Sequence, residues 1–137
     1  MIRARVREAL LRRSEIEVVG EAAGGLDGVK MALSLSPDLV LMDVSMPDLN
    51  GFEATKQILT SAPHIKVLAF SADGGWPNVE SMFLAGAQGF LLKNSDSEEW
   101  LYAIHRVMAG GSFLSPRLRD NHQDTRVEGT PPSPPNH

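Results

Sequence analysis

The chain has 137 residues, of which 42% are hydrophobic and 22% are charged, and its formal net charge is -4. This length and composition are typical of one folded domain. The net charge provides no global field that would attract nucleic acid or an anionic membrane, so we expect no direct nucleic-acid binding by this chain and no membrane partner. The absence of cysteine excludes disulfides, cysteine-ligated metals and thiol nucleophiles. No apolar run approaches the roughly 20 residues that span a bilayer, and we expect a cytoplasmic protein.

The composition changes sharply after Pro116. Residues 117–137 contain only two large aliphatic residues, Leu118 and Val127, and end in a proline-rich run. Such a segment cannot bury enough apolar surface to offset the entropy of ordering it. We therefore predict one folded domain over residues 1–116 and a disordered Pro-rich tail over residues 117–137.

Short apolar runs alternate with stretches of helical period along the folded part. The pattern begins with a helix, because Ile2, Val6 and Leu10 recur at helical spacing with no strand before them. Runs rich in branched or aromatic residues then predict four strands, over 16–19, 39–42, 65–70 and 90–92. Apolar residues at helical spacing predict four more helices, around Leu26/Val29/Leu33, Phe52/Ile58/Leu59, Val79/Met82/Phe83 and Trp100/Ile104/Val107/Met108. This order is typical of an α/β protein with a parallel sheet.

Three of these strands end in residues that carry chemistry. Asp43 follows four consecutive apolar residues, which indicates a strand buried on both faces, while Ser71 and Lys93 follow the next two strands. Open parallel sheets bind ligands in the crevice beyond the carboxyl ends of their strands, so these residues can form one site. There, an ammonium would offset the charge of a modified carboxylate, and a hydroxyl would donate to an added phosphoryl oxygen.

Each residue also has a simpler explanation when it is taken alone. Asp43 can be a strand-end acid that accepts hydrogen bonds from loop amides, Ser71 can be a turn former, and Lys93 can be a solvated surface charge. The segment after Asp43 has the proline and the Asn-Gly pair that tight turns need.

At this point the chain resembles the receiver domains of bacterial two-component response regulators. The resemblance runs from about residue 2 to residue 116 and is carried by three segments, PDLVLMDVSMPDLNG (37–51), VLAFSA (67–72) and GAQGFLLK (86–93). It implies an α/β, doubly wound, flavodoxin-like (CheY-like) fold and a role in phosphorelay signal transduction rather than an enzyme activity.

The same resemblance implies a role for four residues. Asp43 is the expected phosphoacceptor, which takes a phosphoryl group from the phosphohistidine of a sensor histidine kinase. Ser71 is expected to follow the phosphoryl group with its hydroxyl, and Lys93 is expected to be its counter-charge. Phe90 matches the aromatic whose inward or outward rotamer reports the phosphorylated state, although an ordinary core aromatic explains it equally well.

Residues 16–22 (IEVVGEA) and 109–116 (AGGSFLSP) narrow the resemblance to receivers that precede a LuxR-type DNA-binding helix-turn-helix. Residues 117–137 show no apolar pattern of such a domain. The resemblance also implies a homodimer surface around Phe90, formed by the helix of Val79 and the helix of Trp100. Trp76 and Trp100 there can equally be core residues.

Members of this family open with a strand that ends in two adjacent acidic residues, which help the phosphoacceptor bind Mg²⁺. The first ten residues of this chain align instead with the family's first helix, so we expect the first strand and the acidic pair to be lacking, in a sequence that begins inside a longer reading frame. Asp43 and the backbone carbonyl of Ser45 remain as candidate Mg²⁺ ligands. We therefore expect Mg²⁺ binding to be weak or lost.

Two other functions compete with phosphoryl acceptance. A phosphorylation-independent interaction module (a pseudo-receiver) fits the missing acids but not the retained Asp43, Ser71 and Lys93. A phosphatase of the haloacid dehalogenase type also uses a strand-end aspartate, but it needs a second acid two residues later, where this chain has Ser45.

Overall fold

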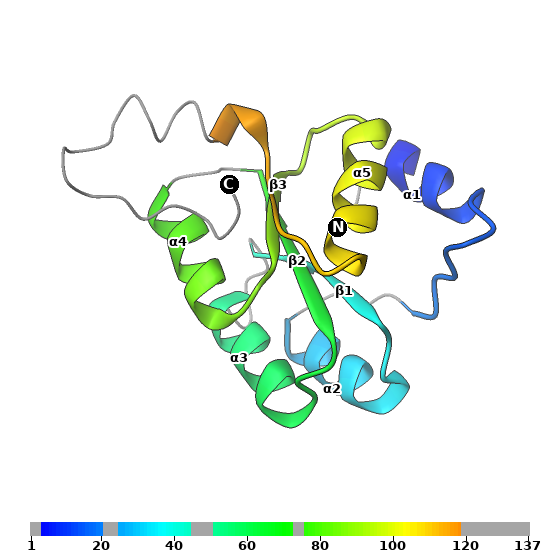
Figure 1. The fold of residues 1–137 in the computed structure, drawn as a ribbon. Coiled ribbons are helices and arrows are strands. Elements are labelled where there is room, and N and C mark those ends of the chain that lie inside the picture. The colour runs from blue at the N-terminus through cyan, green and yellow to red at the C-terminus, as the bar shows by residue number, and fades with distance from the viewer. Residues whose placement is uncertain (1–3, 21–24, 45–50, 73–75, 119–137) are drawn as a thin grey trace, which may run out of the picture.

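The computed structural model describes residues 4–20, 25–44, 51–72 and 76–118. Helices and strands alternate over most of this length, as Figure 1 shows. In chain order the elements are α1 (Ala4–Leu11), α2 (Gly25–Leu35), β1 (Leu39–Asp43), α3 (Gly51–Ser61), β2 (Lys66–Ser71), α4 (Trp76–Ala85), β3 (Gly89–Leu92), α5 (Ser97–Met108) and β4 (Phe113–Leu114).

The strands form one parallel sheet in the order β1-β2-β3-β4. The strand β2 lies inside the sheet, and all but its first residue are buried. Its register pairs Phe70 with Asp43 on one side, and Ser71 with Leu92 on the other. The parallel α/β sheet expected from the alternating pattern is therefore confirmed, and the carboxyl ends of β1, β2 and β3 meet at one edge.

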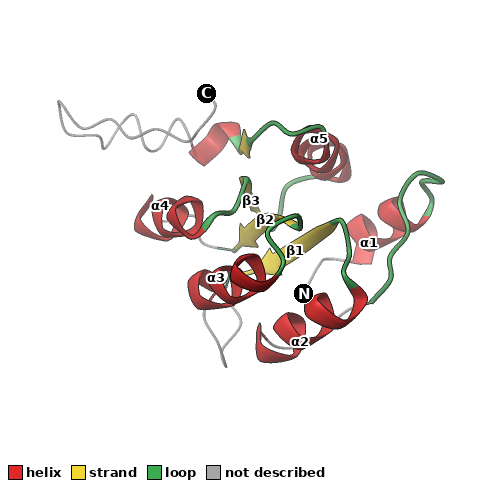
Figure 2. Ribbon diagram, turned by 60° about the horizontal axis from the view of Figure 1, so that its bottom comes forward, coloured by secondary structure: helices red, strands yellow, loops and turns green. Residues whose placement is uncertain are grey.

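Helices cover both faces of this sheet (Figures 1 and 2). The helices α2, α3 and α4 pack over one face and bury Val67 and Ala69 of β2. The helices α1 and α5 pack over the other face and bury Leu68 and Phe70. Successive residues of a strand point to opposite faces, so the uninterrupted apolar run of β2 supplies both halves of the core.

The predicted helices are present, but the buried face of α2 differs from the predicted one. Val29 is buried as expected, whereas Leu26 and Leu33 are exposed. The helix packs chiefly against α3 rather than over β1, and Ala32 replaces the two leucines at the contact. Helical spacing located the helix but not the direction from which its neighbour approaches.

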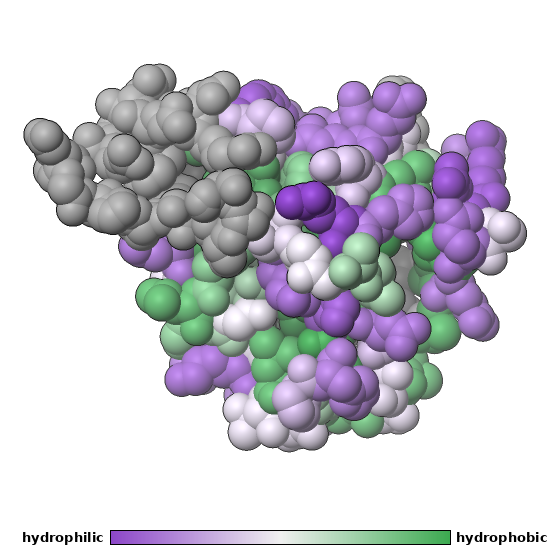
Figure 3. Space-filling view, in the orientation of Figure 1, coloured by the Kyte–Doolittle hydropathy of each residue, from purple (hydrophilic) through white to green (hydrophobic). Residues whose placement is uncertain are grey.

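The strand predicted over residues 16–19 is wrong. This segment has no regular structure and Val18 and Val19 are 38% and 50% exposed. A strand needs a neighbour that supplies ladder hydrogen bonds, and within the described residues β1 pairs only with β2. In Figure 3, patches of apolar surface lie among polar side chains at the right of the molecule, where Figure 1 places α1 and the segment after it.

Two features near the C-terminal end of the described domain were not expected from the sequence. The two-residue strand β4 was not predicted, because two residues are too few to show an alternation. Leu118 is buried, so the core extends two residues beyond the predicted boundary at residue 116. Residues 119–137 of the predicted tail lie outside the described residues. No helix in the described part of the chain is long and apolar enough to cross a membrane.

Trp100 is a core residue. Its side chain is fully buried on α5 and makes an edge-to-face contact with Phe70, with the ring centroids 5.0 Å apart. The side chain of Trp76, the other tryptophan, is outside the described part. Of the two explanations that the sequence left open for Trp100, the structure supports burial.

Candidate functional site

Asp43 is held at the end of β1 by the ladder with β2, which continues past it. The backbone N–H of Val44 donates to the carbonyl of Phe70 over 2.9 Å, so the ladder with β2 continues one residue past Asp43. Val44 in turn packs against Gly51, the first residue of α3, where an added Cβ would lie only 2.6 Å from the Val44 side chain. The carboxylate is 6% exposed. A buried carboxylate needs hydrogen bonds or a counter-charge to stay ionised.

Ser71 and Lys93 lie at the ends of the next two strands. Ser71 closes β2 and is 4% exposed. The backbone N–H of Lys93 donates to the carbonyl of Ser71 over 2.8 Å, which fixes the main chain of Lys93 just beyond β3. The three predicted residues therefore occupy the same edge of three adjacent strands.

The lysine provides the counter-charge of the aspartate. Lys93 Nζ lies 3.8 Å from Asp43 Oδ2, and its side chain is 31% exposed. The cation thus reaches the carboxylate from the solvent side, across the end of the strand that carries Ser71. A carboxylate held beside an ammonium, with a hydroxyl on the intervening strand, is suited to carry an added anionic group.

Phe90 lies behind this site rather than in it. It is fully buried on β3, between Ala69 of β2 and Leu114 of β4, and belongs to the core cluster beneath α4. This placement fits both an ordinary core aromatic and an inward rotamer of a switch residue. Its switch role stays a prediction.

Sequence reasoning missed the residues that hold the end of β3. The Ser115 hydroxyl accepts a hydrogen bond from the backbone N–H of Leu92 and donates one to the Glu99 carboxylate, over 3.3 and 3.0 Å. Arg117 donates to the side chain of Asn94, next to Lys93. Ser115 lies 23 residues after Leu92 in the chain, so no local pattern in the sequence pointed to it.

The helix after Lys93 begins with a cap that the sequence does carry. The Asp96 carboxylate accepts a hydrogen bond from the backbone N–H of Glu99 over 2.9 Å, at the amino end of α5. Aspartate is among the preferred residues at this position, because its side chain satisfies an amide that has no partner inside the helix. The cap starts α5 four residues after Lys93.

The described residues do not form a complete Mg²⁺ site. No group of three or more His, Asp or Glu residues that could hold a metal is found among them. Asp43 provides one carboxylate, and Ser45, the other candidate ligand, lies outside the described part of the chain. Mg²⁺ prefers six oxygen ligands, several of them water, and is usually bound through carboxylates and phosphate. The oxygen donors of the described residues therefore do not make up a Mg²⁺ site.

Known proteins with similar sequences are response regulators. Residues 1–105 match the family described as the response regulator receiver domain. The chain is 38% identical over 118 residues to the response regulator GacA of Pseudomonas aeruginosa, covering 86% of this chain and 55% of that protein. It is 36% identical to the nitrate/nitrite response regulator NarL of Escherichia coli with the same coverage. The chain thus spans about half the length of the curated relatives it matches.

Solved structures show the same fold. A two-component response regulator of the LuxR family from Aurantimonas sp. SI85-9A1 superposes with a TM-score of 0.82 at 33% identity, covering 89% of this chain and 87% of that one. The signal receiver domain of the NarL response regulator from Mycobacterium tuberculosis gives a TM-score of 0.73 at 30% identity, with 77% and 85% covered. These are receiver folds of the CheY-like type.

Proposed function

The chain belongs to the response regulator receiver domain family, and on that premise we propose that Asp43 accepts a phosphoryl group from the phosphohistidine of a sensor histidine kinase. Receiver domains of two-component response regulators are signalling modules of phosphorelays rather than typical enzymes. The single observation that carries the assignment to Asp43 is its buried position at a strand end, 3.8 Å from the ammonium of Lys93.

In the proposed transfer, a carboxylate oxygen of Asp43 attacks the phosphorus atom. A new O–P bond forms while the P–N bond to the histidine breaks, and the electron pair of that bond stays on the imidazole nitrogen. The product is an acyl phosphate with more negative charge than the carboxylate had. Lys93 offsets part of this charge, and Ser71 donates its hydroxyl hydrogen to a phosphoryl oxygen. Phe90 reports the change by moving between inward and outward rotamers.

The proposal also covers the cofactor, the cellular location and the partners of the transfer. Mg²⁺ is the cofactor expected of the family, and with Asp43 as the one described carboxylate at the strand end its binding would be weak or lost. The exchange takes place in the cytoplasm with a histidine kinase, and the surface of α4 and α5 near Phe90 pairs two copies. The chain itself does not bind DNA. Regulation of transcription is proposed only for the response regulator as a whole, because the chain spans 55% of GacA and of NarL.

The small number of metal ligands at the carboxyl end of β1 supports a second function. The described residues contribute one carboxylate there and form no cluster of three metal-binding side chains. Without a cation, an anionic phosphoryl group and an anionic carboxylate repel each other. A pseudo-receiver, which binds its partners without phosphorylation, would keep the fold and lose the transfer.

Labelling with acetyl phosphate or a phosphorylated kinase, read by intact-protein mass spectrometry, separates the two functions. We expect the unchanged chain to gain one phosphoryl group and Asp43→Asn to gain none. Asp27→Asn, which changes an exposed aspartate on α2, is the matched control and should label normally. Ser71→Thr keeps the hydroxyl and should label like the unchanged chain. In Ser71→Ala the extent of labelling should fall about tenfold, since a hydrogen bond to a charged group contributes about 1.5 kcal/mol or more. Unlabelled wild-type chain favours the pseudo-receiver, and a labelled Asp43→Asn variant refutes the assignment to Asp43.

A further inference from the structure

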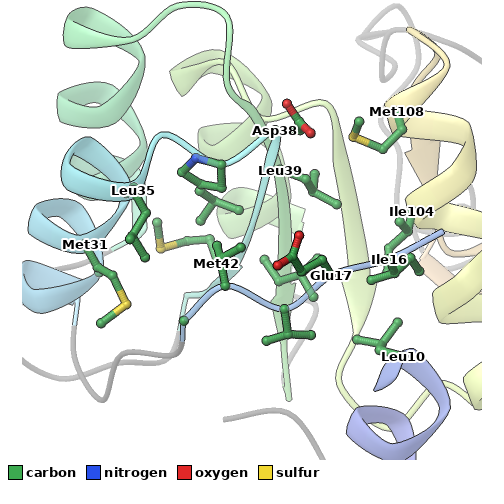
Figure 4. A pocket seen from close by; sticks show the side chains of 18 of the residues that line it. Leu10, Ile16, Glu17, Met31, Leu35, Asp38, Leu39, Met42, Ile104 and Met108 are labelled. Atoms are coloured by element: carbon green, nitrogen blue, oxygen red, sulfur yellow. The ribbon is translucent and has the colours of Figure 1, made fainter. Parts of the chain in front are cut away.

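The two edges of the described sheet are finished differently. Along β1 lies a cavity of about 590 Å³, with Met31 and Leu35 of α2 on one wall and Ile104 of α5 on the other (Figure 4). The receiver family has its own first strand at this place, so the cavity belongs to the fold of the family and offers no separate site. At the opposite edge, β4 has only two residues, and a side chain completes its ladder with β3.

Ser115 provides this side chain at the point where the main-chain ladder stops. Its backbone N–H donates to the Phe90 carbonyl over 3.2 Å. Alternate residues of a parallel strand bond to the same neighbour, so the next donor of β3 is the N–H of Leu92, and its regular acceptor is the Ser115 carbonyl. That carbonyl accepts instead from the N–H of Leu118 over 2.9 Å, because residues 116–118 form a turn of helix. The Ser115 hydroxyl therefore accepts from Leu92 in place of the carbonyl.

The orientation of this hydroxyl is fixed by Glu99. The hydroxyl donates its hydrogen to the Glu99 carboxylate over 3.0 Å, which leaves the oxygen lone pairs to accept from Leu92. Ser115 is 1% exposed, so both bonds are shielded from bulk water. Glu99 is itself placed by the Asp96 cap at the start of α5. One serine side chain thus fastens the end of β3 to α5.

The segment that follows β4 holds both neighbours of Lys93. The residue before it, Leu92, is bonded to the Ser115 hydroxyl. The residue after it, Asn94, accepts from Arg117 over 3.1 Å. The ammonium of Lys93 spans the end of β2 on a flexible stem to reach the carboxylate on β1. The position of its main chain therefore decides how well the ammonium is placed.

We propose that Ser115, oriented by Glu99, is a positioning residue for Lys93 and thereby sets the rate at which Asp43 accepts a phosphoryl group. The inference rests on the function proposed for Asp43. The Ser115 hydroxyl touches no reacting atom. It fixes the strand end from which the ammonium reaches the carboxylate, and so places the charge that offsets the acyl phosphate. The segment after β4 controls the site, because a displacement of residues 115–117 also displaces Lys93.

Labelling of the whole chain with acetyl phosphate, timed by intact-protein mass spectrometry, tests this role. We expect Ser115→Ala to lower the initial rate about fivefold or more, because small displacements of a positioned group cost up to about 100-fold in rate. Ser112→Ala, at another buried serine shortly before β4, is the matched control and should label at the unchanged rate. Equal rates for Ser115→Ala and the unchanged chain overturn the proposal.

Variants of Glu99 separate its role as an acceptor from its charge. Glu99→Gln keeps a carbonyl acceptor for the Ser115 hydroxyl and should label at nearly the unchanged rate, whereas Glu99→Leu should be as slow as Ser115→Ala. Glu98→Leu removes an exposed acid from the same turn of α5 and controls for effects on the start of the helix. If Glu98→Leu slows labelling as much as Glu99→Leu, the effect belongs to the helix and the proposal is wrong.

A double variant shows whether Ser115 acts through Lys93. In Lys93→Met the ammonium is absent, so adding Ser115→Ala should leave the rate of labelling unchanged within about twofold. A general loss of folding would lower the rate in both backgrounds alike. The same fold-change with and without the lysine therefore overturns the proposal.

Hydrogen exchange tests the positioning without any phosphorylation. In Ser115→Ala the backbone N–H groups of Leu92 and Lys93 should exchange about three- to tenfold faster, the factor that corresponds to one hydrogen bond. The N–H groups of α3, on the other face of the sheet, should not change. Faster exchange at Leu92 alone, or equally throughout the chain, overturns the proposal. If the unchanged chain gains no label, the function proposed for Asp43 is wrong, and these exchange rates decide the positioning of Lys93 by themselves.

Discussion

The Nζ atom of Lys93 lies 3.8 Å from Oδ2 of Asp43, although the two residues lie at the ends of strands that are not neighbours in the sheet. The lysine reaches across the end of β2, where its own backbone N–H is bonded to the Ser71 carbonyl. The ion pair thus connects the carboxyl ends of three strands. It also satisfies a carboxylate that is almost fully buried, which would otherwise be costly to ionise.

Replacing this lysine should therefore affect both stability and labelling. We expect Lys93→Met, which keeps an apolar stem and removes the ammonium, to lower the free energy of unfolding by about 1 to 2 kcal/mol, since one partner of a partly buried ion pair is lost. Phosphoryl labelling of Asp43 should fall in the same variant. Urea unfolding measures the first effect. Lys66→Met, at the opposite end of β2, is the control, and equal losses in both variants would show that the pair with Asp43 contributes nothing.

Magnesium binding should be weak, because the described end of β1 offers one carboxylate where Mg²⁺ takes several oxygen ligands. Calorimetric titration of the chain with Mg²⁺ should show no saturation in the submillimolar range. The residual binding should disappear in Asp43→Asn. Saturation at submillimolar Mg²⁺ would mean that residues outside the described part supply the missing ligands.

The sequence was sufficient to predict the parallel sheet and the shared edge at which Asp43, Ser71 and Lys93 lie, because both follow from local patterns. Strand-end positions of Asp43, Ser71 and Lys93 can be counted along the chain, and a parallel sheet brings such positions to one edge. The cavity along β1 and the hydrogen bonds of Ser115 depend instead on which distant segments meet. The branched residues at 16–19 have the propensity of a strand, yet propensity does not provide a partner, and the segment remains unpaired.

Glu15 links the segment after α1 to α5, and its titration should reflect that link. Hydrogen bonds from Arg13 lower the pKa of the Glu15 carboxyl from its ordinary value of 4.5, and a smaller contribution comes from His105. A carboxyl whose pKa is lowered by folding adds stability above its ordinary pKa, and this stability is lost as the pH falls through the lowered value. The contribution of the Glu15 carboxylate to this link is therefore lost in acid.

We expect Arg13→Ala to raise the pKa of Glu15 towards 4.5, as followed by carboxyl NMR shifts, and His105→Ala to raise it less. Arg12→Ala removes a neighbouring cation that makes no recorded contact with Glu15 and serves as the control. An equal response to Arg12→Ala and Arg13→Ala would indicate general electrostatics in place of the hydrogen-bonded pair.

The open edge of β1 should limit the stability of the chain. An unpaired strand edge leaves main-chain groups without ladder partners and invites pairing with other chains. A further strand of five or six residues along β1 would also bury several aliphatic side chains, each contributing about 1.5 to 3 kcal/mol when fully buried. Domains of this size have only about 5 to 15 kcal/mol of stability in total, so the burial that is absent along β1 is comparable with the whole margin.

We therefore expect the 137-residue chain to melt at low temperature or to self-associate, as followed by circular dichroism and light scattering over a range of concentrations. Fusing an apolar strand that ends in two acidic residues upstream of Met1 should raise the melting temperature and the Mg²⁺ affinity together, because one segment would fill the cavity beside β1 and bring carboxylates to Asp43. A Gly/Ser segment of equal length is the control and should raise neither. If the unmodified chain melts cooperatively as a monomer above about 55 °C, within the usual mesophile range, the four described strands close a competent sheet by themselves and the expectation is wrong.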